Sequence, residues 1–282
     1  MIPFLDLTRQ HRAIRDELTA ALARVVDAAQ FVLGPEGRAL EAELAARCGV
    51  RHGIGVGSGT DALRLALAAL GVGPGDEVVT PAFSFVASAS TILMAGARPV
   101  FADVDARTCT VDPDAVGRAL TPRTRAVIVV HLYGHPAPVD AIVALAGARG
   151  VAVIEDAAQA IGATWRDRPV GAWGDAACIS FYPTKNLGAC GDAGMLVTDR
   201  EDVAARVRRL RHHGDGGRYR HVELGYCSRL DELQAAALRV KLRHLDRWTE
   251  ARRAIAARYR AGLAGLPLTL PVERPGARHV YH

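Results

Sequence analysis

Short apolar runs alternate with stretches of helical periodicity along most of the chain. Runs typical of strands cover residues 53–56, 77–80, 99–103, 126–130, 151–155, 176–180 and 194–198. Helical spacing appears over residues 60–70, 84–94, 113–120, 139–149 and 200–212. Near-continuous apolar strands joined by helices are typical of a parallel sheet that is covered on both faces. We therefore predict an α/β fold of three α/β/α layers, built on a mostly parallel seven-stranded sheet.

The two ends of the chain have a different pattern. Apolar side chains recur at a helical spacing at Ile14, Leu18, Leu22 and Val25. This spacing predicts a helix over 9–28 with Thr8 as its N-cap, and a second helix is expected over 36–48. Residues 230–263 predict a long helix with a break near Trp248, and residues 278–282 resemble the opening of a strand.

Composition narrows the function only slightly. The chain has 282 residues, of which 50% are hydrophobic, which is enough for one large core and part of a second domain. Its net charge of +5 is compatible with an anionic ligand such as a nucleotide sugar, although an arginine-rich solvated surface is the simpler explanation. No compact Lys/Arg block interleaved with aromatics indicates nucleic-acid binding, and no apolar run approaches the roughly 20 residues that span a bilayer.

The cysteines and the N-terminus indicate a cytoplasmic protein. The run from Met1 to Leu7 is too short for a signal peptide, because Asp6 and Arg9 interrupt it. The five cysteines are scattered without metal-type pairing, so we expect reduced thiols: Cys48, Cys109, Cys178, Cys190 and Cys227.

Two charged residues stand where predicted strands end. Asp156 follows the strand 151–155, and Lys185 follows the strand 176–180 between Pro183 and Gly188. Ligands of such sheets bind beyond the carboxyl ends of the strands. A lysine amine there can bind the aldehyde of pyridoxal 5'-phosphate (PLP), and a carboxylate can keep the pyridine nitrogen protonated, so that the ring withdraws electrons. The alternatives are a helix-capping aspartate and a surface lysine, but the apolar flanks favour a buried amine with a lowered pKa.

A glycine-rich turn at residues 57–63 enters a predicted helix. Backbone N–H groups and the helix dipole attract a phosphate at such a turn, and Thr60 and the strand-end Ser180 can add donors. The alternative is an ordinary N-capped turn. Phe83 and Phe85 follow another strand end, where one of them could stack on a pyridine ring or pack into the core.

His131 and His135 flank a further strand end. We interpret both as structural or substrate-facing, because no carboxylate or cysteine stands at ligand spacing from them. The sequence therefore predicts no metal site.

The combination of these motifs resembles the DegT/StrS family of sugar aminotransferases, which have the fold-type I PLP architecture. The resemblance extends over residues 2–7, 57–63, 80–87, 155–160, 180–188 and 225–236. It implies that Lys185 binds the cofactor and moves the proton, and that Asp156 pairs with the pyridine nitrogen. It also implies that Gln159 lies beside the ring near its 3'-oxygen and that Phe85 stacks on the ring.

The resemblance further implies a phosphate site shared between two subunits. Gly59, Thr60 and Ser180 would hold the phosphate, and residues 225–236 would reach into the neighbouring subunit's site of a homodimer. The family pattern normally has Asn where Cys227 stands, and a thiol is a much weaker donor than an amide. Cofactor affinity or the dimer contact is therefore expected to be weaker here.

The expected substrates are an amino-acid donor, with glutamate implied by the resemblance, and the keto sugar of a nucleotide diphosphate. We predict that Arg218 and Arg220 of the basic loop 212–220 contact the nucleotide diphosphate, although a solvated loop is the alternative, and we include Tyr226 among the substrate contacts. Three other functions stay open: a sugar dehydratase, an aminotransferase for a cyclitol or aminobenzoate precursor, and a silent partner or regulator. Dehydratase relatives have His where Lys185 stands, which argues against the first.

The expected domain organisation follows the same resemblance. Residues 1–30 form an N-terminal helical arm that contributes to a small domain, residues 31–240 form the PLP-binding large domain, and residues 241–282 begin the C-terminal small domain. Family members usually continue beyond residues 279–282, so we expect this small domain to be incomplete.

Overall fold

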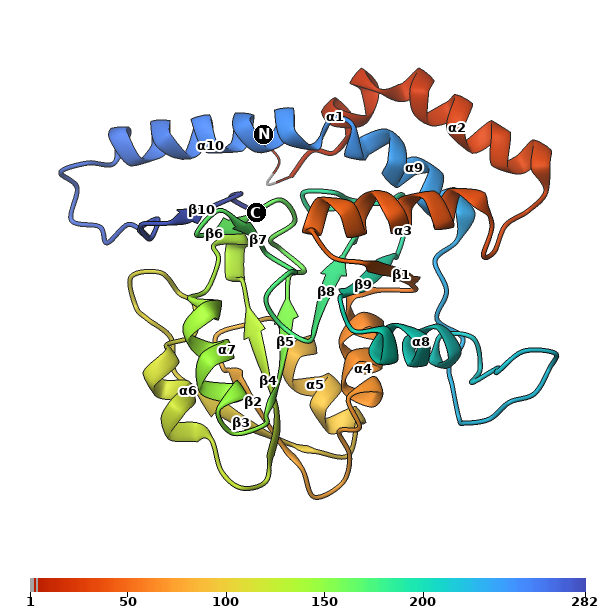
Figure 1. Cartoon of the computed structure of the whole chain (residues 1–282). Coiled ribbons are helices and arrows are strands. Elements are labelled where there is room, and N and C mark those ends of the chain that lie inside the picture. Colours follow the sequence, from red (N-terminus) through yellow and green to blue (C-terminus); the bar gives the residue numbers. More distant parts are fainter. Residues whose placement is uncertain (1–2, 4) are drawn as a thin grey trace.

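The computed structural model describes residue 3 and residues 5–282, and a seven-stranded sheet forms its centre (Figure 1). The strands are β1 (His52–Val56), β2 (Glu77–Pro81), β3 (Arg98–Ala102), β4 (Thr124–Val130), β5 (Ala152–Asp156), β8 (Ala176–Ser180) and β9 (Gly194–Thr198). Their spatial order is β1-β9-β8-β5-β4-β2-β3. The five strands from β8 to β3 are parallel, whereas β9 is antiparallel to both of its neighbours. The predicted mostly parallel seven-stranded sheet is confirmed.

Helices cover both faces of this sheet, as the alternation of side chains along each strand requires. One face packs against α4 (Gly59–Ala69), α5 (Ala87–Met94) and α8 (Glu201–Leu210), and the other against α3 (Pro35–Cys48), α6 (Pro113–Ala119) and α7 (Val139–Gly147). In β4, Ile128 belongs to the α4 side and its neighbours Val127 and Val129 to the α7 side. The three-layer prediction is therefore confirmed.

Four helices from the two ends of the chain gather at one end of the molecule (Figure 1). They are α1 (Thr8–Ala13), α2 (Arg15–Ala28), α9 (Glu232–Leu242) and α10 (Leu245–Gly262). Apolar side chains of α2 pack against α9, including Leu18 against the cluster around Ala237. The division into a helical arm, a large domain and a small domain stays a prediction.

Two local predictions about these helices are wrong. Thr8 is the first residue of α1 and not its N-cap, because its backbone N–H and its hydroxyl both donate to the Asp6 carboxylate. The predicted helix 9–28 is also interrupted at the buried Ile14, whose backbone leaves the helical region. The predicted break in the long C-terminal helix is present, between Leu242 and Leu245 and so slightly before Trp248. The part of the family resemblance that falls on residues 2 and 4 lies outside the described residues.

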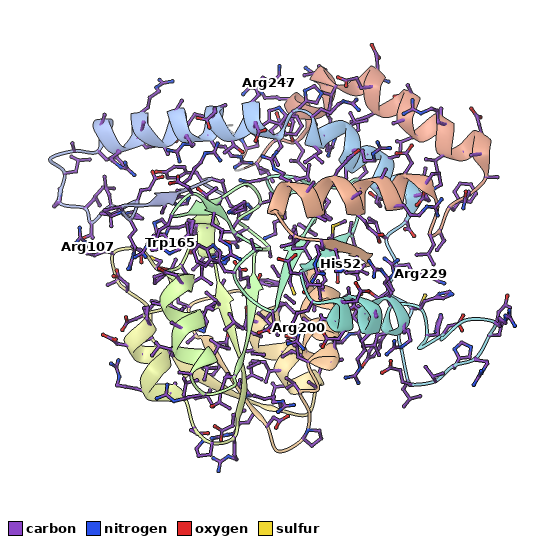
Figure 2. All side chains as sticks on the ribbon, in the orientation of Figure 1. His52, Arg107, Trp165, Arg200, Arg229 and Arg247 are labelled. Carbon is purple, nitrogen blue, oxygen red and sulfur yellow. The ribbon has the colours of Figure 1, made fainter. Side chains whose placement is uncertain are left out.

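A second, small sheet was not predicted, although its strand β10 (Ala277–Arg278) shares Arg278 with the strand opening expected over 278–282. It contains β6 (Thr164–Trp165), β7 (Arg168–Pro169) and β10, in the order β10-β6-β7. Strands of two residues are too short to show a period of two, so only tertiary contacts reveal them. Trp165, labelled in Figure 2, anchors this sheet on α7 because its indole N–H donates to Asp140 Oδ1 at 2.7 Å.

The described residues, 3 and 5–282, contain neither a membrane-spanning helix nor a metal-binding cluster. No helix there is both long and apolar enough to cross a membrane. No group of three or more His, Cys, Asp or Glu side chains there is arranged to hold a metal ion. His131 and His135 instead make hydrogen bonds, with Glu155 and with the backbone N–H of Arg274.

Candidate active site

A cavity of about 550 Å³ opens at the carboxyl ends of β4, β5 and β8, beside the start of α4. Seven of the predicted site residues line it: Gly59, Thr60, Phe85, Asp156, Gln159, Ser180 and Lys185. They come from distant parts of the sequence and meet because the carboxyl ends of parallel strands share one edge of the sheet.

Lys185 is carried by a tight turn between β8 and β9. Its backbone N–H donates to Tyr182 O at 2.8 Å, and the N–H of Ala189 donates to Phe181 O at 2.7 Å, which closes the turn at its base. The side chain is half-buried, and this burial lowers the pKa of its amine, although the nearby charge of Asp156 opposes the shift. A larger fraction of the amine is therefore neutral, and only the neutral form is a nucleophile or a base.

Asp156, the last residue of β5, presents a buried carboxyl to the same cavity. Burial raises its pKa, and three contacts oppose this shift: the hydrogen bonds from Ala158 N at 3.2 Å and from Ser88 Oγ at 3.0 Å, and the charge of Lys185. A cationic ring nitrogen bound in the cavity would favour the ionised carboxylate further. A carboxylate at this position can accept a hydrogen bond from a protonated pyridine nitrogen, so the site fits such a ring.

The start of α4 lies against the end of β8 and offers hydrogen-bond donors to the cavity. Ser58 is the N-cap and accepts a hydrogen bond from Asp61 N at 3.0 Å, which leaves the first backbone N–H groups of the helix directed at the cavity. Gly59 allows the close approach, because a Cβ there would lie 2.6 Å from Ser180 Cβ. Thr60 and Ser180 add hydroxyl groups to the cavity wall. This cradle of N–H and O–H donors fits a phosphate.

Two further predicted residues occupy the cavity wall. Gln159 accepts a hydrogen bond from the backbone N–H of Tyr133 at 2.5 Å, which holds its amide in place. Phe85 lines the cavity with its side chain largely exposed, so the ring is available to stack on a ligand. Phe83 does not line the cavity and instead makes an edge contact with Tyr133.

Four predicted residues do not line this cavity. Arg218 and Arg220 lie on the exposed loop that extends from the end of α8 (Figure 1). Tyr226 follows that loop and packs under the guanidinium of Arg64, 3.9 Å from its ring centre. Cys227 is exposed, and its Sγ accepts from Arg229, labelled in Figure 2, at 2.9 Å. Their predicted roles involve a second subunit or a bound substrate, so these roles stay predictions.

The sequence analysis did not predict a buried hydrogen bond between His131 and Glu155 next to the cavity. His131, interpreted there as structural or substrate-facing, lines the cavity and contacts Glu155 Oε2 through Nε2 at 3.0 Å. His131 Nδ1 accepts from Ala137 N, which assigns the proton to Nε2. Burial opposes the charge of Glu155, but hydrogen bonds from His131 and from the backbone of Gly171 and Gly174 outweigh it and hold its pKa below the usual value.

Ser88 was missed altogether. It is buried on α5, donates to Asp156 Oδ2, and lies 2.8 Å from Ser84 Oγ, which itself lines the cavity. The two serines therefore connect the cavity with the Asp156 carboxyl. Their spacing of one helical turn is visible in the sequence, but nothing in the sequence shows that the turn faces Asp156.

Comparisons with known proteins agree with this geometry. The model of the DegT/DnrJ/EryC1/StrS aminotransferase family matches residues 12–282. A UDP-N-acetyl-3-dehydro-alpha-D-glucosamine 3-aminotransferase from Acidithiobacillus ferrooxidans is 50% identical over 281 residues, which cover 100% of this chain and 76% of the relative. A dTDP-3-amino-3,4,6-trideoxy-alpha-D-glucose transaminase from Streptomyces venezuelae is 50% identical over 282 residues, covering 100% of this chain and 74% of the relative.

The fold is equally close to a solved structure. The crystal structure of DesV from S. venezuelae superimposes with a TM-score of 0.97 at 50% sequence identity, covering 100% of this chain and 76% of that one. These matches confirm the family that the sequence motifs indicated, and with it the PLP-dependent fold. The cofactor of the family is PLP, which the donor set around the cavity fits. The chain belongs to the DegT/DnrJ/EryC1/StrS aminotransferase family.

Proposed function

We propose that this protein transfers an amino group from an amino acid, with glutamate as the expected donor, to the keto carbon of a sugar carried by a nucleoside diphosphate. The observation that most directly supports this proposal is that the amine of Lys185 and the carboxyl of Asp156 line one cavity together with the start of α4, where we expect the phosphate to bind. The names of the two relatives place their sugars on UDP and dTDP, which supports a nucleotide-linked sugar here.

Each residue of the cavity has a defined task in this reaction. PLP, when bound, supplies an aldehyde and an electron-withdrawing ring. Lys185 Nζ takes up a proton from the reacting carbon and returns it, because its lowered pKa makes the neutral amine accessible. Asp156 holds a negative charge against the ring nitrogen, and Ser88 keeps that carboxylate oriented. The first N–H groups of α4, with Thr60 and Ser180, bind the phosphate.

The remaining contacts belong to a proposed homodimer in the cytoplasm. Cys227 of one subunit would approach the cofactor phosphate of the other, where its thiol is a weak donor. Arg218 and Arg220 would bind the nucleotide diphosphate, because guanidinium groups pair with phosphates in a bidentate way. Both arginines lie on the extended loop beyond α8, where another subunit can meet them.

The test follows nitrogen from donor to acceptor. The purified protein with PLP is incubated with ¹⁵N-glutamate and with keto sugars linked to UDP or dTDP, and mass spectrometry measures ¹⁵N in the nucleotide sugar. We expect transfer by the wild type and none by Lys185→Arg, whose guanidinium cannot replace the amine. A cyclitol ketone in the same panel tests the alternative aminotransferase. Transfer by the arginine variant, or transfer to the cyclitol alone, would contradict the proposal.

A second measurement addresses the loop. Replacing Arg218 and Arg220 together by Ala should raise KM for the nucleotide sugar and leave the half-reaction with glutamate unchanged. Because both side chains are exposed, the fold should tolerate the change. An unchanged KM would show that the loop does not bind the nucleotide.

A further inference from the structure

Lysine is almost absent from this chain. Only two of its 35 Lys and Arg residues are lysines, Lys185 and Lys241. Because nearly all cationic side chains of this chain are arginines, we infer that a lysine is present where a compact ammonium on a narrow stem is needed. Lys185 is explained by the cofactor. Lys241 lies on α9, outside the cavity, with only 2% of its surface exposed.

Lys241 is a costly residue to bury. Its Nζ donates to Gly188 O at 2.7 Å and lies 2.8 Å from Nε2 of His11 on α1. Among the residues that the structure describes, no carboxylate lies within 4 Å of this amine. A buried ammonium without a counter-charge destabilises the fold unless its hydrogen bonds compensate. Accordingly, burial lowers the pKa of Lys241. We therefore expect Lys241 to have a function that offsets this cost of burial.

Gly188 closes the turn that carries Lys185. A Cβ on Gly188 would overlap the carbonyl oxygen of Pro183, so the two ends of the turn lie directly against each other. The hydrogen bond from Ala189 N to Phe181 O joins the same two ends. A displacement of the Gly188 carbonyl must therefore move the backbone of Lys185, three residues earlier.

Helix α9 also holds the segment just beyond this turn. Gln234 Oε1 accepts from the backbone N–H of Cys190 at 2.8 Å. Gln234 and Lys241 are about two helical turns apart and therefore lie on the same face of α9. This face makes hydrogen bonds to the segment at Gly188 and at Cys190. From the other side, Asn186 Nδ2 donates to Val280 O at 3.1 Å. The turn is thus held from two directions, and among residue 3 and residues 5–282 the charged contact comes from Lys241.

We propose that Lys241 is a positioning residue for Lys185: its ammonium holds the Gly188 carbonyl and thereby fixes the turn that presents the reactive amine to the cavity. The inference rests on the proposed function only in taking Lys185 as the reactive amine. It also explains why lysine is found here, since its ammonium is a compact donor at the end of a flexible stem.

The scarcity of lysine makes the test direct. Protein labelled with ¹³C at lysine Cε shows two lysine signals, and the one that disappears in Lys241→Met is assigned to Lys241. In the cofactor-free protein, we expect Lys241→Met to shift and broaden the Lys185 signal. Reductive trapping with PLP and borohydride should modify Lys185 with an affinity about ten- to a hundredfold weaker, as for the loss of a hydrogen bond from a charged group.

His11→Ala is the matched control. It removes the other partner of Lys241 and the contact with α1, but it leaves the bond to Gly188, so the Lys185 signal and the PLP affinity should stay within about threefold of wild type. Lys241→Gln keeps a polar group that is one bond too short to reach Gly188. It should behave like Lys241→Met and decides the question if the methionine variant does not fold.

The outcomes separate the two claims. A folded Lys241→Met or Lys241→Gln protein with an unchanged Lys185 signal and unchanged PLP affinity would overturn the positioning role. An equal change in His11→Ala would also overturn it, because general packing would then be responsible. If the wild type is trapped at Lys185 but transfers no nitrogen, the proposed function fails while the signals of the cofactor-free variants still test the positioning of Lys185.

Discussion

Gly59→Ala tests how closely the start of α4 must approach the end of β8. The added Cβ would lie 2.6 Å from Ser180 Cβ and 3.1 Å from Ser180 Cα. Carbon atoms in contact prefer about 3.5–4.0 Å, so the start of α4 and the end of β8 must separate by roughly 1 Å. Neither atom of Ser180 can swing aside, because both are fixed by the backbone of β8.

The size of the effect follows from where the strain is relieved. Overpacking of this kind costs about 1–3 kcal/mol. Relief by separation moves the N–H donors of α4 away from the Ser180 hydroxyl, and both groups are expected to bind the same phosphate. If the whole cost appears in cofactor binding, the Kd for PLP rises about five- to 150-fold. The thermal stability of the cofactor-free protein should change less than this affinity.

The assay is a titration of the cofactor-free protein with PLP, followed by absorbance. Gly117→Ala on α6 is the matched control, because no atom lies within 4 Å of its added Cβ. Alanine there should stabilise the helix by about 0.5–1 kcal/mol and leave the affinity unchanged. A Gly59→Ala protein that binds PLP as tightly as wild type would refute the reasoning, and so would an equal loss in the control.

Three further predictions concern the carboxyl of the site and the buried histidines. Asp156→Asn should keep PLP attached but lower kcat about a hundredfold or more, because an amide cannot hold the charge opposite the ring nitrogen; steady-state kinetics that match wild type would contradict this. Ser88→Ala removes one of the two hydrogen bonds to Asp156 and should lower kcat about tenfold, with the larger loss at low pH where the carboxyl protonates first; a pH profile identical to wild type would exclude the role. Burial lowers the pKa of His279 to about 3 and that of His135 to about 4. As the pH falls below about 6.5, these histidines become protonated in the unfolded chain but stay neutral in the folded protein. The free energy of unfolding is therefore highest above pH 6.5 and decreases between about pH 6.5 and 3. At pH 5 the loss is about 2 kcal/mol for each histidine, and urea unfolding of His279→Gln should show a shallower pH dependence than wild type; an equal slope would contradict the assignment.

The sequence was most informative where local pattern and chemistry coincide. The seven strands were recognisable because each is a short apolar run between turns, and Asp156 and Lys185 were recognisable because they follow two of those runs. Their meeting in one cavity follows from parallel topology, which the alternation of strands and helices indicates. The glycine-rich turn at Gly59 was found for the same reason.

Features that depend on tertiary contacts escaped. Lys241 is one more polar residue on a helix until α1 and the Lys185 turn enclose it, and Ser88 is an ordinary helical serine until it meets Asp156. The interruption at Ile14 depends on how the terminal helices pack, and so does the exact position of the break that was predicted near Trp248. The strands of the small sheet are too short to carry a pattern.

The most direct test is the visible absorption spectrum of the purified protein with PLP, before and after the addition of glutamate and then of a nucleotide-linked keto sugar. We expect a band that forms with wild type but not with Lys185→Arg, disappears with glutamate, and returns when the keto sugar is added. A folded protein that forms no band at Lys185, or a band that responds to neither substrate, would contradict the assignment of this cavity as an aminotransferase site.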